Sequence, residues 1–331
     1  MSRRVLLSAR PEGFPSDEHF EVEDAPEPEP QDGEFVVAVS HISLDPAMRG
    51  WMRDVPSYIP PVQIGEVMRA GAVGRVIASR HSGFAEGDNV HGGFGVTEHA
   101  VSDGKGVQKV DPGAAPLPTY LGALGLTGMT AYFGLLDVGR PEAGQTVVVS
   151  GAAGAVGGMV GQIAKLKGCR VVGIAGGEEK CAHVVEELGF DACIDYKGGD
   201  VRKGLREHAP DGVDVYFDNV GNPILDTVLT RINRGARVVI CGAISQYNAD
   251  SMSGPANYMM LLVQSARMEG FVVFDYARRY GEAAQEIAAW MADGSLVTKE
   301  DVVSGSVADF PTVLRRLFDG DNIGKLILEI A

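Results

Sequence analysis

Alternating apolar and polar positions mark about the first 115 residues of the chain. The segments Glu34–Ser40 (EFVVAVS) and Ala70–Ser79 (AGAVGRVIAS) have the two-residue period of half-buried strands. Turn-forming glycine, proline and aspartate separate such runs, at residues 31–33, 84–92 and 111–113. We therefore expect a β-rich first part, in which the acidic, proline-rich segment Ala25–Gly33 is an exposed connection.

After Pro118 the pattern changes to apolar strands that alternate with helices. Small and apolar residues at helical spacing fill Thr119–Gly139, and further helices are predicted from Glu178 to about Leu188 and over Gly281–Gly294. The predicted strands are nearly all apolar; they are Val147–Ser150, Arg170–Ala175, Ala192–Asp195, Gly212–Gly221, Ala236–Ser245 and Arg267–Val273. Because such strands bury both faces, we expect a parallel sheet with helices on both sides.

This pattern divides the chain into three segments. Residues 1–117 form the β-rich domain, residues 118–295 the domain with the parallel sheet, and residues 296–331 a tail. The tail ends in the strand-like Gly324–Ile330, and we expect it to pack back on the first domain. With 331 residues, of which 45% are hydrophobic, the chain is long enough to bury two cores.

A glycine-rich loop joins the first strand of the predicted sheet to a helix. It reads Ala152-x-Gly154-x-x-Gly157, with alanine in the first glycine position of a dinucleotide-binding fingerprint. We expect the backbone at Gly154 to approach a pyrophosphate and Gly157 to let the helix pack closely on the strand. The helix N-terminus, with Ala155 and Val156, then offers N–H groups to the phosphates. An ordinary glycine-rich turn is the alternative, and the flanking strand and helix favour the dinucleotide.

The end of the second strand indicates which dinucleotide binds. An NAD site usually has an acidic residue there, about 20 residues past the loop, for the ribose hydroxyls. Here the strand ends at Gly176 and Gly177 without a carboxylate, and Lys180 can meet a 2′-phosphate. Glu178 and Glu179 would repel that phosphate unless they point away from it in the first helical turn. We therefore favour NADP(H) over NAD(H); the alternative for Lys180 is a solvated helix residue.

Net charge and cysteine content limit the classes of partner and the cellular location that we expect. The formal net charge of −15 argues against nucleic acid or an anionic membrane as a partner. No run approaches the ~20 apolar residues that span a bilayer. The four cysteines have neither metal-site nor disulfide spacing, so we expect reduced thiols in a cytoplasmic protein. A proline and a glycine at residues 11 and 13 end the short apolar run near the start, which argues against an export signal.

Residues that could bind a catalytic metal are scattered along the sequence. The first 168 residues contain no cysteine, and His41, His81, His91 and His99 lack a ligand partner at suitable spacing. We therefore expect no metal, and hydrogen-bonded or surface roles for these histidines. Without a Lewis acid, oxidation of a simple alcohol is disfavoured, and another group must stabilise a developing oxyanion.

Several motifs together resemble one known family. They are SLDPAMRGWM (43–52), GLTGMTAYFGLLDVG (125–139), SGAAGAVGGMVGQIAK (150–165), YFDNVG (216–221), CGAISQYN (241–248), RMEGFVV (267–273) and NIGK (322–325). Over nearly its whole length the chain resembles the medium-chain dehydrogenase/reductase superfamily, in its zinc-independent leukotriene B4 12-hydroxydehydrogenase/prostaglandin reductase branch, which includes alkenal double-bond reductases. The resemblance implies an α/β fold with a doubly wound Rossmann sheet and a GroES-like β-barrel domain, and it implies a homodimer.

The resemblance also implies roles for individual residues. Lys180 and Tyr196 would contact the 2′-phosphate of NADP(H), and Asn219 would lie beside the nicotinamide half. The other residues on the nicotinamide side would be Cys241, Gly242, Ala243, Ile244, Ser245, Phe271, Val272, Val273 and Asn322. Structural roles are the alternative: a turn at Asn219, a surface position for Tyr196, and core packing for the apolar residues.

A metal-free NADPH site suits reduction of the C=C bond of an α,β-unsaturated ketone or aldehyde. Hydride adds to the β-carbon and negative charge develops on the carbonyl oxygen, which then needs a hydrogen-bond donor. Tyr247, which follows the predicted strand Ala236–Ser245, is the candidate donor, and a passive pocket wall is the alternative for it. A zinc-free quinone reductase and a non-catalytic NADPH-binding protein are the rival functions.

Two residues are candidates for an apolar substrate cleft. They are Met48 and Tyr258, although Met48 fits a core position nearly as well. Its neighbour Arg49 either pairs with Asp45 to hold the loop or is a solvated charge.

Overall fold

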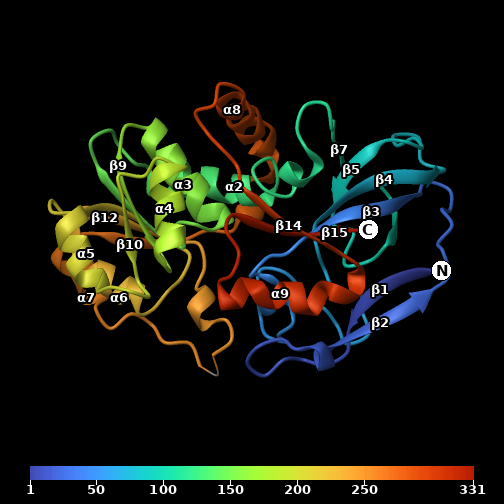
Figure 1. The fold of residues 1–331 in the computed structure, drawn as a ribbon, viewed down its shortest axis with the longest axis horizontal. Helices are drawn as coiled ribbons and strands as arrows, with labels where there is room; N and C mark the ends of the chain where they lie inside the picture. Colours follow the sequence, from blue (N-terminus) through green and yellow to red (C-terminus); the bar gives the residue numbers. More distant parts are fainter. Residues whose placement is uncertain (250) are drawn as a thin grey trace. The chain divides into compact units, whose positions relative to one another are not determined.

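The chain divides into two units. The computed structural model describes residues 1–249 and 251–331. The first unit contains Met1–Gly122 and Glu300–Ala331, and the second contains Ala123–Lys299 (Figure 1). The C-terminal segment thus belongs to the same unit as the start of the chain. The bounds given above for the three sequence segments stay predictions.

The second unit is built on a six-stranded parallel sheet in the order β10-β9-β8-β11-β12-β13. Counted from β8, this is the 3-2-1-4-5-6 order of a doubly wound dinucleotide-binding sheet. Figure 1 labels β9, β10 and β12 of this sheet. The strands are β8 (Thr146–Ser150), β9 (Arg170–Ala175), β10 (Ala192–Asp195), β11 (Val213–Asp218), β12 (Ile232–Ile240) and β13 (Arg267–Gly270). The predicted Rossmann sheet is therefore confirmed.

Helices cover both faces of this sheet because successive strand residues face two separate apolar clusters. Val147 and Val149 belong to the cluster that includes residues of α2, α3, α4 and α8. Val148 between them belongs to the cluster formed with α5 and α6. The helices are α2 (Leu126–Phe133), α3 (Ala155–Leu166), α4 (Glu178–Glu186), α5 (Val201–His208), α6 (Ile224–Leu229), α7 (Met259–Val263) and α8 (Tyr280–Ala292).

The first unit is dominated by a largely antiparallel sheet in the order β14-β15-β3-β4-β5-β7, with β6 also paired to β3. Only the β14–β15 pair is parallel among the described pairs of this sheet. The elements are β3 (Phe35–Ser43), α1 (Met48–Trp51), β4 (Ala72–Ser79), β5 (Asn89–Gly92), β6 (His99–Ser102), β7 (Gln108–Lys109), β14 (Glu300–Gly305), α9 (Phe310–Asp319) and β15 (Lys325–Ile330). Its arrangement agrees with the predicted GroES-like domain.

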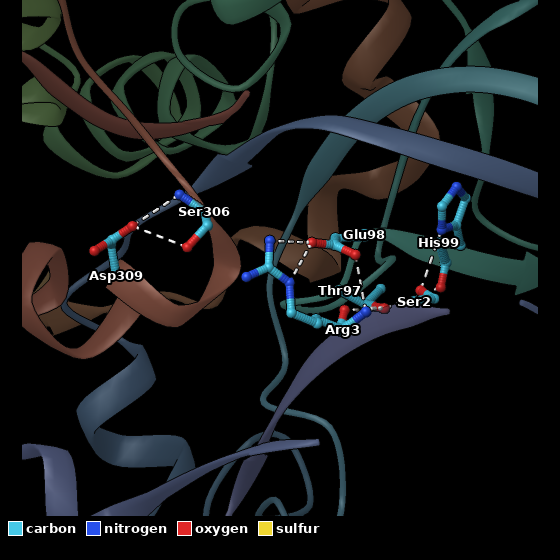
Figure 2. A network of polar contacts seen from close by, with 7 residues as sticks. All are labelled: Ser2, Arg3, Thr97, Glu98, His99, Ser306 and Asp309. Atoms are coloured by element: carbon cyan, nitrogen blue, oxygen red, sulfur yellow. Dashed lines mark hydrogen bonds and ion pairs between the residues drawn. The ribbon is translucent and has the colours of Figure 1, made fainter. Parts of the chain in front are cut away.

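The start of the chain is a strand that polar contacts join to residues 97–99 of the same unit. β1 (Ser2–Leu7) pairs with β2 (Phe20–Ala25) as a separate two-stranded sheet. Figure 2 shows the Arg3 guanidinium against the Glu98 carboxylate, with Nε 2.8 Å from Oε1. The Arg3 backbone N–H donates to Glu98 Oε2 at 2.9 Å. In the same view Ser2 Oγ lies 3.1 Å from His99 Nδ1.

Some predicted elements end earlier than the apolar pattern suggests. The strand expected over 236–245 ends at Ile240, and the one expected over 267–273 ends at Gly270. The helical spacing of 119–139 is divided among a 3-10 turn at Leu117–Tyr120, α2, and a π-helical segment at Gly134–Gly139. Within the described residues, none of the helices has the length and apolar character that crossing a bilayer requires.

Candidate active site

The strand order of the second unit places its candidate site at the ends of β8 and β11. These two strands are neighbours, and the chain runs outward from them in opposite directions along the sheet. Ligands of doubly wound sheets bind in the crevice outside such a switch point, at the carboxyl ends of the strands. Asn219 follows β11 there, and its Nδ2 donates to the Ser150 carbonyl oxygen at 2.7 Å. Its backbone N–H donates to Ser150 Oγ at 2.9 Å.

The glycine-rich loop ends at the N-terminus of α3. Gly154 is the N-cap residue, with φ −85° and ψ 170°, and no side chain caps the helix. The first N–H groups of a helix need partners from outside it, and an anion is a suitable partner. Uncapped N–H groups at this end of α3 therefore fit a phosphate, as the sequence predicts for residues 154–157.

Close packing in this loop explains two of its small residues. A Cβ placed on Gly157 would lie 2.2 Å from the Gly151 carbonyl oxygen, so only glycine fits there. Ala152, in the first glycine position, is fully buried. Its Cβ would lie 2.9 Å from a Cβ placed on Gly173 of β9, so the glycine at 173 makes room for this alanine. Gly151, which the sequence reasoning did not single out, has a φ of +61° that favours glycine.

The structure brings Tyr196 to the end of β9. A Cβ placed on Gly176 would lie 2.9 Å from the Tyr196 hydroxyl oxygen, so the ring lies against this glycine. Gly177 has a φ of +97°, and its N–H donates to Asp195 Oδ1 at 2.7 Å. That hydrogen bond is the largest cause of a pKa of Asp195 below its ordinary value. Asp195 was not predicted; it holds the turn between the strand and α4.

Lys180 lies in the first turn of α4 and is half-buried. Glu178 and Glu179, which precede it in the same turn, are exposed. Acidic residues are stabilised at a helix N-terminus, which accounts for this pair without a ligand. The predicted roles of Lys180 and Tyr196 toward a 2′-phosphate stay predictions.

Residues 241–247 are held against the end of β11 by backbone hydrogen bonds. The N–H groups of Cys241 and Gly242 donate to the Asp218 carbonyl oxygen at 2.9 and 3.1 Å. The Ile244 N–H donates to the Asn219 carbonyl oxygen at 3.2 Å. These bonds end β12 at Ile240 and bring the segment next to Asn219.

Tyr247 folds back over the start of this segment. The Ala243 N–H donates to the Tyr247 hydroxyl oxygen at 3.2 Å, so this bond does not use the phenol's own proton. A Cβ placed on Gly242 would lie 2.8 Å from the same oxygen, which explains the glycine. The ring is half-buried. Ser245, also in the segment, is exposed and its hydroxyl donates to the carbonyl oxygens of Val220 and Asn222 at 2.6 and 2.8 Å.

Asp218 is the main residue of this site that sequence reasoning missed. It ends β11, is fully buried, and accepts four hydrogen bonds on Oδ1. It stands in the quoted motif YFDNVG directly before Asn219, and that position was the available signal.

Phe271 and Val273 have the packing contacts of core residues. The Phe271 ring makes an edge contact with Phe217, with ring centroids 6.4 Å apart, and both residues pack on the apolar cluster that contains α2 and α3. The Val273 carbonyl oxygen accepts from the Tyr280 hydroxyl at 3.0 Å. Val272 precedes the 3-10 helix Val273–Arg279 in an extended conformation. These contacts support the alternative, structural role for this stretch.

Met48 and Arg49 of the first unit are both buried. Met48 is 0% exposed and belongs to the apolar core, which favours its core role over a place in a substrate cleft. Arg49 is 1% exposed, so it is not the solvated charge that was one expectation. Its guanidinium donates to the carbonyl oxygens of Gly13 and Pro11, each at 3.0 Å. The ion pair of Asp45 is formed by Lys325 instead, with Nζ 2.8 Å from Oδ1.

The remaining predicted residues lie at two separate places in the chain. Asn322 precedes β15, and its Nδ2 donates to the Gly324 carbonyl oxygen at 2.9 Å. Tyr258 precedes α7 in the second unit and is 58% exposed. Their predicted roles stay predictions.

His41 and His81 of the first unit have hydrogen-bond partners. Ser40 Oγ lies 2.9 Å from His41 Nδ1, and the Gly83 N–H donates to His81 Nδ1 at 2.9 Å. Burial lowers the pKa of His41 and that of His91 below their ordinary values. In the described part of the chain, no three or more His, Cys, Asp or Glu side chains are grouped so that they could hold a metal ion.

Comparison with known proteins identifies the family. Family profiles match residues 3–110, described as the N-terminal domain of oxidoreductase, and residues 155–289, described as zinc-binding dehydrogenase. The chain is 40% identical to the NADPH-dependent curcumin reductase of Escherichia coli, over 100% of this chain and 97% of the relative. It is 39% identical to prostaglandin reductase 1 of Rattus norvegicus, over 96% of each chain. The crystal structure of CurA in complex with NADPH from Vibrio vulnificus matches with a TM-score of 0.95 and 43% identity, over 99% of each chain.

The chain therefore belongs to the medium-chain dehydrogenase/reductase superfamily. Within the superfamily it falls in the branch of the prostaglandin and alkenal double-bond reductases, as the sequence motifs indicate.

Proposed function

We propose that this chain reduces the C=C bond of α,β-unsaturated ketones and aldehydes with NADPH, without zinc, and that Tyr247 stabilises the enolate oxygen. The observation that carries the proposal is the hydrogen bond from the Ala243 N–H to the Tyr247 hydroxyl oxygen. Accepting from the backbone holds the phenol in place, and its O–H is a hydrogen-bond donor of the kind that a developing oxyanion requires.

The family makes this chain an NADP-dependent oxidoreductase. The uncapped start of α3 supports a dinucleotide, because it leaves N–H groups for a pyrophosphate, and Gly157 lets the helix pack closely on the loop. We assign residues 154–157 to the pyrophosphate, Lys180 and Tyr196 to the 2′-phosphate, and Asn219 with the backbone of 241–245 to the nicotinamide side. Asn322 is assigned to the same side, as an expectation from the family.

When bound, NADPH supplies the hydride that the β-carbon of the substrate receives. The chain itself orients the substrate and stabilises the negative charge that develops on the carbonyl oxygen. Tyr247 donates a hydrogen bond to the carbonyl oxygen, where negative charge increases during the reaction. The same hydroxyl then delivers a proton toward the α-carbon, directly or through water. Neither step requires an unusual acidity of the phenol.

The proposal that the reaction uses no zinc is based on the sequence. Catalytic zinc sites use three protein ligands drawn from Cys, His and Asp or Glu. In this chain the first cysteine is Cys169, and the early histidines are separated along the chain. Metal analysis of the purified, active protein tests the point, and a stoichiometric transition metal required for turnover would contradict it.

Assays of NADPH oxidation with three acceptor conditions test the reaction. We expect turnover with a simple enone, less with a quinone, and none without an acceptor. Tyr247→Phe removes the donor and keeps the ring, so kcat/KM for the enone should fall by about 100- to 1,000-fold, as when an oxyanion donor is lost elsewhere. Tyr120→Phe is the matched control and should leave kcat/KM unchanged, because the Tyr120 hydroxyl donates to the Asp111 carbonyl oxygen at 2.8 Å in the first unit.

The outcomes separate the candidate functions. Quinone turnover well above enone turnover would identify a quinone reductase instead. Binding of NADPH with no turnover of either acceptor would identify a non-catalytic cofactor-binding protein. An unchanged kcat/KM of Tyr247→Phe for the enone would support the proposed reaction and contradict the proposed role of the phenol.

We also propose that the protein is a cytoplasmic homodimer. β13 is the last strand of its sheet, so one edge of it has no partner strand among the described residues. Beside it in the chain, α7 exposes apolar side chains, with Leu262 71% and Val263 61% exposed. An open edge next to an apolar surface favours association with a second copy about a two-fold axis. The location is supported by the four cysteines, all of which are free thiols.

A further inference from the structure

A carboxylate lies buried at the centre of the candidate site. Asp218 is 0% exposed and ends β11 at the switch point of the sheet. Its Oδ1 accepts hydrogen bonds from the hydroxyls of Ser150 and Tyr216 at 2.9 and 2.7 Å. The N–H groups of Val220 and Gly221 donate to the same oxygen, both at 3.0 Å. Four donors therefore converge on one oxygen of this side chain.

The Asp218 carboxylate has no ion-pair partner among the described residues of the second unit. Among the described residues, no lysine, arginine or histidine forms an ion pair with it. Its second oxygen, Oδ2, is buried and has no hydrogen-bond partner in the same set. Keeping a buried carboxylate without an ion-pair partner costs free energy, which its hydrogen bonds must offset.

The field of this charge extends to the segment proposed to face the nicotinamide. The Asp218 carbonyl oxygen accepts from the N–H groups of Cys241 and Gly242, which fixes that segment beside the carboxylate. Burial first, and the Asp218 charge second, raise the pKa of the Cys241 thiol to about 12. Asn219, the next residue in the chain, is the other group assigned to the nicotinamide side.

We propose that Asp218 is a positioning residue whose fixed charge favours the oxidised, cationic nicotinamide ring over the neutral reduced ring. This rests on the proposed function, because it requires the nicotinamide to lie at the ends of β8 and β11. A fixed negative charge near the ring, in a medium of effective dielectric constant about 20, attracts the cationic ring and leaves the neutral one nearly unaffected. The site then binds NADP⁺ more tightly relative to NADPH, which makes the bound NADPH a better hydride donor.

Binding of the two cofactor forms, without substrate, tests this inference. Asp218→Asn keeps the acceptor oxygen Oδ1 and replaces Oδ2, which has no partner, so the hydrogen bonds can survive while the charge is lost. We expect the Kd of NADP⁺ to rise about tenfold more than that of NADPH, both measured by isothermal titration calorimetry. Ser150→Ala is the matched control, because it removes one donor to Oδ1 and keeps the charge. It should change both Kd values by the same factor.

Equal weakening of both forms by Asp218→Asn would overturn the proposal, since a purely structural role predicts that result. Asp218→Ser, a second neutral variant, provides the same comparison if the asparagine variant does not fold. A shifted ratio in a protein that does not reduce enones would support this inference and overturn the proposed reaction. Failure of the unmodified protein to bind either form would overturn both.

Discussion

Lys180 is the residue on which the choice between NADPH and NADH depends. It lies in the first turn of α4, after a strand end formed by two glycines, where NAD enzymes usually place a carboxylate. A hydrogen bond to a charged group contributes about 1.5–3 kcal/mol, which is about 10- to 150-fold in affinity. We therefore expect Lys180→Ala to raise the KM for NADPH by about tenfold or more and to leave the KM for NADH nearly unchanged.

Steady-state kinetics with both cofactors measure this difference. Lys203→Ala is a suitable control, because Lys203 also lies in the first turn of a helix, α5, and is exposed. Its removal should affect neither cofactor. If Lys180→Ala weakened NADPH and NADH equally, the residue would act on the fold of the turn and not on the 2′-phosphate.

The residues recognised from sequence are those with a local signature. Gly157 is fixed by a spacing, and its close contact with Gly151 fulfils the packing role predicted for it. Lys325 was missed because its partner is distant in the chain: Asp45 follows β3. Asp218 stands in the motif YFDNVG, but its bond from Ser150 of β8 also joins residues far apart in the sequence. The burial of Arg49, which contradicts a solvated charge, has the same origin, since two of its acceptors are carbonyl oxygens near the start of the chain.

At the scale of elements, a buried ion pair connects β15 to the loop that follows β3. Lys325 is 4% exposed, and its Nζ donates to the Leu44 carbonyl oxygen at 2.6 Å and to Asp45 Oδ1 at 2.8 Å. Removing one partner of a buried pair leaves the other charge unpaired and typically costs about 3–5 kcal/mol. Asp45 remains partly exposed, so Lys325→Met should lower the free energy of unfolding of the first unit by about 2–3 kcal/mol.

Chemical denaturation measures this loss. The exposed pair of Lys105 and Asp103, with Nζ and Oδ2 2.6 Å apart, supplies the comparison. Lys105→Met should change stability by less than about 1 kcal/mol, because exposed ion pairs contribute little. A Lys325 variant as stable as the Lys105 variant would show that the pair does not hold β15 in place.

Elements with strong apolar runs were predicted well. β9 and β10 have the bounds predicted, since each is a short buried strand bounded by turn residues. β12 ends before its apolar run does, because Cys241 and Gly242 bind the Asp218 carbonyl oxygen instead of extending the strand. β14 and α9 were not predicted. β14 is largely polar, so it lacks the apolar pattern of a buried strand. Among the described strands it pairs with β15, and its own sequence does not indicate this partner.

At the scale of the whole molecule, the class of sheet followed from the alternation of strands and helices, whereas the strand order did not. A parallel sheet of six strands allows several orders, and sequence pattern alone does not choose among them. The family motifs supplied that choice, and the observed order places β8 beside β11. The same order leaves β13 at the sheet edge, and α7 with its exposed apolar side chains directly precedes β13 in the chain.

That edge leads to a prediction about assembly. α7 follows Tyr258 and exposes Met259, Leu262 and Val263, while three of the four residues of β13 are themselves exposed. If a second copy covers this surface, a charge on it opposes association, because burying an unpaired carboxylate is costly. Leu262→Glu should therefore convert a species of two 35.0 kDa chains into one of a single chain, as measured by light scattering after gel filtration.

Ile77→Glu is the control for this prediction. It lies at a 47% exposed apolar position on β4 and should leave the mass unchanged. A wild-type protein with the mass of one chain would contradict the dimer outright, and a dimeric Leu262→Glu variant would place its interface on another surface.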